Sequence, residues 1–270
     1  MTQTLASRKD FTLETYKQVA WQGETVAFDE SALKRIGACR EAFDRLIEDP
    51  DITIYGVTSG YGQMAKVRLT PEQRKEHANR PPLTAMTSFG EPMPARVVRG
   101  MVFARLTNFV EGHSAVRPHL AEVVAEMLDG RPLPSVPALG NGCPGEILAL
   151  SHLFAHLGET ETFVEKEMLS LINGSPCATA LISDAALAAQ ARFDLALKVF
   201  ALSSEALKVP LTHFDADLEE LWGDPHETRA LKGLRDLIDG GAPVGERRPY
   251  QAPVSWRILP RVLGLSLIHI

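Results

Sequence analysis

Several features that would indicate a nucleic-acid-binding, membrane or nucleotide-binding protein are missing from this chain of 270 residues. Its net charge is −6 and its lysines and arginines form no basic stripe, so no nucleic acid partner is expected. No apolar run approaches the roughly 20 residues that a membrane helix needs. Phosphate-binding and dinucleotide-binding motifs are missing too, and residues 1–10 lack the apolar segment of a secretory signal. The mixed charges at 74–80 indicate a solvated surface.

Disulfide and metal-binding patterns are also missing. Cys39, Cys143 and Cys177 form no closely spaced pair, and an odd count of distant cysteines suits a reducing cytoplasm. His152 and His156 have a spacing that can bind a metal ion, but no further ligand follows at a recognisable interval. We therefore predict structural histidines, no metal and a cytoplasmic location.

Helical periodicity dominates what is present. The composition, 45% hydrophobic and 23% charged, allows a substantial core in one or two domains. Residues 178–207 are nearly free of helix breakers and are apolar on more than one side, which predicts a long helix buried as in a bundle. Other helices are predicted at 95–110, 119–128 and 227–239, an amphipathic run at 32–47, and short strands at 25–28 and 52–55. The expected fold class is mainly α.

Four segments concentrate the residues that could carry chemistry. Tyr55 opens Tyr-Gly-Val-Thr-Ser-Gly-Tyr-Gly at 55–62, and Cys-Pro-Gly at 143–145 lies in a proline- and glycine-rich stretch. Asn173 lies in Lys-Glu-Met-Leu-Ser-Leu-Ile-Asn-Gly-Ser, and Gln251 and Arg257 lie in Gln-Ala-Pro-Val-Ser-Trp-Arg-Ile-Leu-Pro-Arg-Val-Leu-Gly. In this order, the segments resemble the motifs of the aromatic amino acid ammonia-lyases, the family of the histidine, phenylalanine and tyrosine lyases.

The resemblance implies a fold and an assembly. An ammonia-lyase-like N-terminal domain with short strands is expected at 1–175, followed at 176–264 by the first part of a central long-helix bundle of the L-aspartase type. The resemblance covers the N-terminal half of a family subunit, so we expect a truncated bundle. It also implies a homotetramer. Residues 265–270 break the family pattern, and we hypothesise that they are a non-native tail.

The resemblance also implies roles for single residues. Tyr55 matches the tyrosine proposed as acid/base, and Asn173 matches the asparagine beside the family's electrophile. Arg257 would hold the substrate carboxylate, a task suited to the two parallel donors of a guanidinium. Gln251 would position the substrate as a polar neighbour. The family's second catalytic tyrosine is replaced by Val254.

The segment before residue 89 also departs from the family. By spacing, Ala85 takes the position of a residue that contacts the substrate ring, and Pro81 and Pro82 lie where the family has a helix. Two adjacent prolines do not fit the interior of a regular helix. The ring contact is therefore expected to be lost or rebuilt.

The third departure concerns the cofactor. In the family, Ala-Ser-Gly cyclises into the electrophile methylidene-imidazolone, MIO, and here the triplet is Cys143-Pro144-Gly145. The middle residue must form an imine through its nitrogen and lose its side-chain hydroxyl as water. Proline has no hydrogen on that nitrogen and no hydroxyl. We therefore expect no MIO and no other cofactor.

Cys143 has two interpretations. A helix is expected to open at Gly145, and a thiol just before a helix N-terminus has a lowered pKa, so Cys143 is a candidate nucleophile. The favoured alternative is a small buried hydrophobic residue. Cys177 has the weaker case.

Two functions remain open at the level of sequence. The first is elimination or a related proton transfer on an amino-acid-like carboxylate without MIO, using Tyr55 and Arg257. The second is a catalytically silent homologue that binds a small acid or has a structural role in an assembly. Pro144 and Val254 favour the silent or altered chemistry, and the other matched residues favour a preserved pocket.

Overall fold

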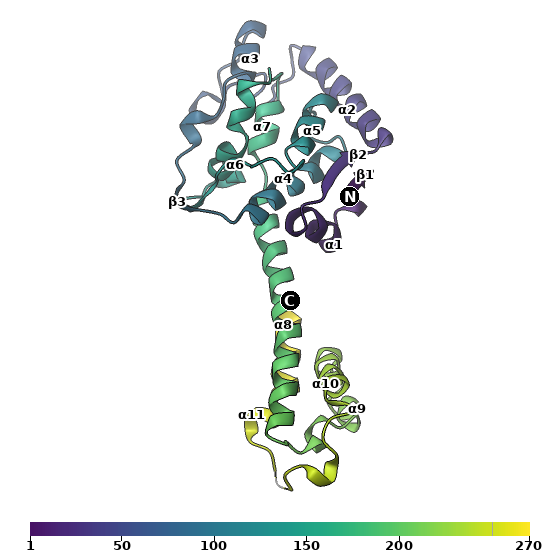
Figure 1. Cartoon of the computed structure of the whole chain (residues 1–270). Coiled ribbons are helices and arrows are strands. Elements are labelled where there is room, and N and C mark those ends of the chain that lie inside the picture. Colours follow the sequence, from purple (N-terminus) through teal and green to yellow (C-terminus); the bar gives the residue numbers. More distant parts are fainter. Residues whose placement is uncertain (250) are drawn as a thin grey trace. The chain divides into compact units, whose positions relative to one another are not determined.

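The computed structural model describes residues 1–249 and 251–270 (Figure 1). Helices dominate and the strands are short, which confirms a mainly α fold. The chain forms two compact units, Met1–Asp184 and Ala185–Ile270. The division lies inside helix α8 (Pro176–Ala206), whereas the sequence placed the domain boundary at the first residue of that helix.

Unit 1 contains two small sheets among its helices. In chain order its elements are β1 (Thr2–Leu5), α1 (Leu13–Tyr16), β2 (Thr25–Phe28), α2 (Glu30–Glu48), α3 (Pro71–Ala78), β3 (Phe89–Pro92), α4 (Ala95–Val110), α5 (Pro118–Glu126), β4 (Pro137–Leu139), α6 (Ile147–Phe154), α7 (Glu167–Ile172) and the start of α8. Strands β1 and β2 pair in parallel, and β3 and β4 pair antiparallel.

Helix α4 supplies much of the core of unit 1. It is buried on all sides, through Val97, Val98, Met101, Val102, Phe103, Ala104, Leu106, Phe109 and Val110. A helix that is apolar all round needs partners on several faces, and α4 contacts α2, α5 and the π-helical turn Lys17–Trp21. One charged residue of this helix, Arg105, is also buried.

The first turns of α8 are fixed within unit 1. The hydroxyl of Tyr16 donates to the carbonyl of Ala180 at 2.9 Å. Asp184 accepts hydrogen bonds from the Trp21 indole at 2.9 Å and from the Arg96 guanidinium at 2.7 Å. The guanidinium of Arg96 also lies over the Trp21 ring, 5.2 Å from its centroid. These contacts join α8 to the N-terminal segment and to α4.

The described residues of unit 2 form the rest of α8 and the helices α9 (Asp217–Trp222), α10 (Pro225–Ile238), α11 (Val254–Arg257) and α12 (Leu259–His269). Its core consists of Phe193, Leu197, Ala201, Phe214, Ala230, Leu231, Leu234, Ile238, Leu259, Leu263 and Leu267. Helices α10 and α12 pack closely at Gly264 of α12 and Glu227 of α10. A β-carbon added to Gly264 would lie only 2.6 Å from Cα of Glu227, so the contact leaves no room for a side chain at 264. Most of the segment 265–270 continues α12.

The predicted helices are confirmed, and one of the two predicted strands is wrong. The predictions at 95–110, 119–128, 178–207 and 227–239 match α4, α5, α8 and α10, the run at 32–47 lies in α2, and the strand at 25–28 is β2. Residues 52–55 do not form the predicted strand. The hydroxyl of Thr58 accepts from the N–H of Ile54 at 2.7 Å, and the carbonyl of Ile54 accepts from Val57. These bonds fold the segment into turns.

Candidate active site

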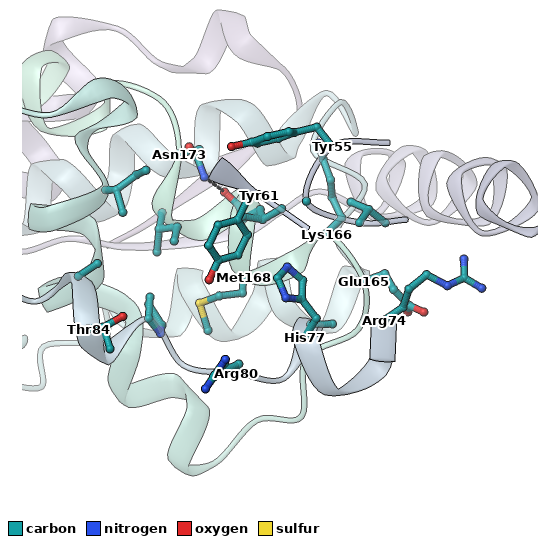
Figure 2. Close-up of a pocket in the computed structure, with 18 residues that line it drawn as sticks. Tyr55, Tyr61, Arg74, His77, Arg80, Thr84, Glu165, Lys166, Met168 and Asn173 are labelled. Atoms are coloured by element: carbon teal, nitrogen blue, oxygen red, sulfur yellow. Dashed lines mark hydrogen bonds between the residues drawn. The ribbon is translucent and has the colours of Figure 1, made fainter. Parts of the chain in front are cut away.

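A cavity of about 210 Å³ in unit 1 brings two of the expected site residues together (Figure 2). Its wall is formed by the loop at 55–62, the end of α3, the segment 80–85 and helix α7, with one contact from α6. Tyr55 and Asn173 both line it. Apolar side chains, among them Val57, Met168 and Leu169, form much of the remaining wall.

The loop that carries Tyr55 depends on a glycine. Gly56 has a φ of +70°, and a β-carbon there would lie 2.7 Å from Cδ1 of Leu169 on α7. Only glycine combines this backbone with such a close approach at low cost. Tyr55 itself is 61% exposed, and its hydroxyl oxygen accepts a hydrogen bond from the N–H of Gly62 at 2.9 Å. The phenolic proton is not used in that bond.

Asn173 ends α7 and is held from two sides. Its side-chain amide donates to the carbonyl of Leu169 at 3.0 Å, and its own carbonyl accepts from the buried guanidinium of Arg105 at 2.6 Å. A β-carbon on Gly145 would lie 3.0 Å from the side-chain oxygen of Asn173. The structure therefore places Asn173 directly beside the Cys-Pro-Gly turn.

The turn at 143–146 differs from the expected helix opening. Gly145 and Glu146 both have positive φ, of 72° and 56°, and α6 begins at Ile147 rather than at Gly145. Cys143 precedes a single 3₁₀ turn, Pro144–Glu146. The thiol is thus not at the N-terminus of α6, so the dipole argument for its activation is wrong. Cys143 is partly exposed, and its nucleophilic role stays a prediction.

Two residues that the sequence did not single out support this turn. The carboxylate of Glu146 accepts from the N–H groups of Cys177 and Ala178, at 2.7 and 2.9 Å. Arg105 is 2% exposed, and burial lowers its pKa to about 10. Burial and the nearby Glu146 raise the pKa of the Cys177 thiol, which weakens the case for Cys177 as a nucleophile. The sequence signal for Arg105 was a charge between the apolar residues 101–104 and 106, in the second half of α4.

The two prolines before β3 lie outside any helix, as expected. The segment after α3 is not helical at Pro81 and Pro82, and a single 3₁₀ turn covers Leu83–Ala85. Pro82, Thr84 and Ala85 line the cavity. Ala85 offers no polar group to a ligand.

The interpretation of 74–80 as a solvated surface is wrong in part. Arg74, His77 and Arg80 line the cavity, because the end of α3 faces the loop at 55–62. The ring of His77 lies 4.9 Å from that of Tyr61. Lys166 also lines the cavity and has a φ of +81°, a conformation that costs a non-glycine residue free energy.

Gln251 and Arg257 belong to the second unit. Gln251 is exposed, and Arg257 ends α11, the helix that begins at Val254. The Nε atom of Arg257 is buried and has no hydrogen-bond partner in the described part of the chain. The neighbouring Trp256 fixes α11 by donating to the hydroxyl of Ser204 at 3.1 Å.

The described residues form neither a metal cluster nor a membrane-spanning helix. Within residues 1–249 and 251–270, no three or more His, Cys, Asp or Glu side chains are arranged to hold a metal ion. His152 lies in α6, whereas His156 lies in the 3₁₀ turn Ala155–Glu159, so the two do not share one regular α-helix. Of the helices described, none has both the length and the apolar character to span a membrane.

Comparison with known proteins identifies the family. The family model described as aromatic amino acid lyase matches residues 11–165 and 159–270. The chain belongs to the aromatic amino acid lyase family. It is 29% identical over 284 residues to the histidine ammonia-lyase of Paracidovorax citrulli, in an alignment that covers 95% of this chain and 55% of that protein. This lyase-family chain thus spans about half the length of the curated relatives it matches.

Solved structures show the same fold. Histidine ammonia-lyase from Trypanosoma cruzi is similar with a TM-score of 0.81 and 24% identity, over 98% of this chain and 53% of that one. Ergothionase from Treponema denticola, an ergothioneine-degrading enzyme, is similar with a TM-score of 0.83 and 19% identity, over 98% and 58%. These likenesses confirm the ammonia-lyase-like fold of the chain.

The residues of this lyase-family chain do not fit formation of MIO. Pro144 begins the turn in the middle of the Cys143–Gly145 triplet, and its ring nitrogen cannot become an imine. The neighbouring groups are nevertheless in place, since Asn173 lies against Gly145. The site therefore combines a retained polar surrounding with a triplet that cannot cyclise.

Proposed function

We propose that the protein is an ammonia-lyase-like enzyme that performs elimination, or a related proton transfer, on an amino-acid-like carboxylate without MIO. The observation that carries this proposal is the cavity shared by Tyr55 and Asn173 beside the turn at 143–145. Such a reaction needs a base near the β-carbon and an anchor for the carboxylate, and the chain keeps candidates for both.

Each candidate residue has a role. Tyr55 exchanges the proton, and the N–H of Gly62 fixes the position of its hydroxyl oxygen by donating a hydrogen bond to it. Asn173 and Gln251 position the substrate through polar contacts. Arg257 holds the carboxylate with its guanidinium. Cys143 is a second candidate for a catalytic group because it lies in the turn that carries the electrophile in the family.

The leaving group is the chemical difficulty. An amine leaves easily only when it has been activated, and the chain has no residue at 144 that could become the activating electrophile. A quaternary ammonium avoids this requirement, because it has no N–H to lose and so keeps its positive charge until the C–N bond breaks and the nitrogen leaves as a neutral tertiary amine. We therefore propose substrates whose amino nitrogen is substituted, alongside ordinary amino acids.

A silent homologue is the second candidate. Pro144 and Val254 replace two residues that the family's chemistry uses, which favours a protein that binds a small acid or supports an assembly. For either function we propose a homotetramer, by analogy with the family, and a cytoplasmic location, because all three cysteines are free.

The test is a screen of the purified protein for ultraviolet absorbance of an unsaturated acid. The panel contains histidine, phenylalanine, tyrosine and their Nα-trimethylated forms. We expect turnover of a trimethylated form, its loss in Tyr55→Phe, and its retention in Tyr61→Phe, a matched tyrosine of the same cavity. Binding without any unsaturated product would support the silent homologue instead. Sensitivity to borohydride, or a mass lower by two waters across 143–145, would contradict the absence of MIO.

A further inference from the structure

We propose that the far end of the cavity binds an anion, and that the substrate is an amino-acid-like molecule whose side chain ends in a carboxylate held by Arg80. This inference rests on the proposed function, because it places the reacting end of the same molecule at Tyr55 and Asn173. Arg80 would act in binding and specificity, not in proton transfer.

The charges of the wall support an anionic ligand. Arg74, Arg80 and Lys166 line the cavity, whereas Glu165 is the one acidic side chain among its lining residues. Arg74 is engaged elsewhere, since it donates to the carbonyl of Ile47 at 2.8 Å. In Figure 2, Glu165 lies away from Arg80. Within the ranges that the structure describes, Arg80 has no acidic partner at ion-pair distance.

The backbone around Arg80 is fixed by its neighbours. The side-chain oxygen of Asn79 accepts from the N–H of Phe163 at 3.1 Å, and Phe163 is buried. On the other side, a β-carbon on Gly158 would lie 3.0 Å from Cγ of Pro81, so the proline ring packs closely on that glycine. Arg80 is therefore an exposed guanidinium on an anchored segment, which reduces the entropy lost when it binds a ligand.

The two ends of the cavity suit the two ends of one molecule. Figure 2 shows Tyr55 and Asn173 at one side and Arg80 at the other, with Tyr61 and Met168 between them. The aromatic and apolar middle fits the body of a side chain. Burial, and next the charge of Arg80, lower the pKa of His77, so that its imidazole stays neutral and Arg80 supplies the positive charge at this end.

The far end of the cavity also offers a hydroxyl group. Ala85 contributes no polar side-chain atom to the wall. Thr84, in the same segment 80–85 as Arg80, adds a hydroxyl to the cavity wall. A terminal carboxylate can accept hydrogen bonds from both a hydroxyl and a guanidinium.

Direct binding of acid and amide pairs tests the subsite. Isothermal titration of the complete chain would compare aspartate, glutamate and 2-aminoadipate with asparagine, glutamine and the side-chain amide of 2-aminoadipate. We expect at least one acid to bind roughly tenfold or more tightly than its amide, as for a charge-assisted pair. Arg80→Gln should abolish this preference and leave the affinity for the amide unchanged. Arg45→Gln, an equal charge change at an exposed position of α2 outside the cavity wall, should preserve it.

Several results would overturn the subsite. These are equal affinities for acids and amides, a preference that survives in Arg80→Gln, or no binding of any acid in the series. The screen for unsaturated products, extended to these acids and amides and their Nα-trimethylated forms, separates the two proposals. If acids are preferred but never converted, the subsite stands and the proposed lyase function fails. If acid and amide forms are converted equally well, the lyase function stands and the subsite fails.

Discussion

The carboxylate of Glu146 accepts a hydrogen bond of 2.7 Å from the backbone N–H of Cys177 at the start of α8. A second bond, of 2.9 Å, comes from Ala178. Glu146 thereby satisfies two N–H groups that the first turn of a helix leaves unpaired, and its charge lies at the positive end of the helix dipole. Because Glu146 directly follows the turn at 143–145, the same carboxylate fastens that turn to α8.

The stability of unit 1 should depend on this contact. We expect Glu146→Ala to lower the free energy of unfolding by about 1–2 kcal/mol, the usual loss for a helix cap with a favourable charge. Urea unfolding followed by circular dichroism measures it. The control is Glu41→Ala, an exposed glutamate of α2 with no hydrogen bond or ion pair in the described residues. Equal losses in both variants would contradict the capping role.

The cysteines should differ in reactivity for the same reason. Burial and the charge of Glu146 raise the pKa of Cys177, so iodoacetamide should label Cys143 at least about tenfold faster than Cys177 near neutral pH. Glu146→Gln removes the charge, lowers the pKa of Cys177 and should speed its labelling. Peptide mass mapping measures the extent of labelling at each cysteine. Equal rates at the two thiols would refute this order, and inertness of Cys143 would end its candidacy as a nucleophile.

The Tyr55 loop can be tested with two glycines of similar backbone. Gly56 and Gly23 have φ values of +70° and +78°, but only Gly56 is crowded, by Leu169. Gly23→Ala should cost about 1 kcal/mol through backbone strain alone. Gly56→Ala should cost a further 1–3 kcal/mol, roughly, from overpacking, and should displace Tyr55. Thermal melts compare the two variants, and a loss no larger than that of Gly23→Ala would show that the contact with Leu169 is not restrictive.

Four histidines with lowered pKa values, His77, His152, His156 and His213, should make stability depend on pH, and His152 is the one tested by substitution. Its Nε2 atom is buried without a partner in the described chain, and burial lowers its pKa below the ordinary 6.5. The unfolded state then binds more protons than the folded state near and below that value, so stability rises with pH. Between roughly pH 7 and pH 5 the protein should lose stability on acidification. His152→Gln should flatten this slope in urea melts, whereas His113→Gln, at an exposed histidine, should leave it unchanged.

The local spacing of apolar residues predicted the helices well, whereas long-range contacts decided which segments form strands. Periodic apolar residues located α4 and α8, because each turn of these helices repeats the same requirement for burial. The segment 52–55 has a strand-like composition, but the hydroxyl of Thr58 accepts a hydrogen bond from the N–H of Ile54 and so holds the segment in a turn. Strand β1 was not predicted from the sequence because it is short and forms only by pairing with β2.

The site was predictable only where motifs carried it. Tyr55 and Asn173 were identified by resemblance, and they share one cavity. Arg105 and Glu146 act through partners 68 and 31 residues away in sequence, a separation that spacing rules do not cover. The mixed charges at 74–80 are typical of a solvated surface, and only the folded structure shows that Arg74, His77 and Arg80 line the cavity.

The Trp21 indole, bonded to Asp184 and covered by the Arg96 guanidinium, gives unit 1 an optical reporter of its own. Of the three tryptophans, Trp222 and Trp256 belong to the other unit. With those two replaced by phenylalanine, intrinsic fluorescence would record when the N-terminal segment detaches from α8, so that the melting of unit 1 is seen separately from that of unit 2.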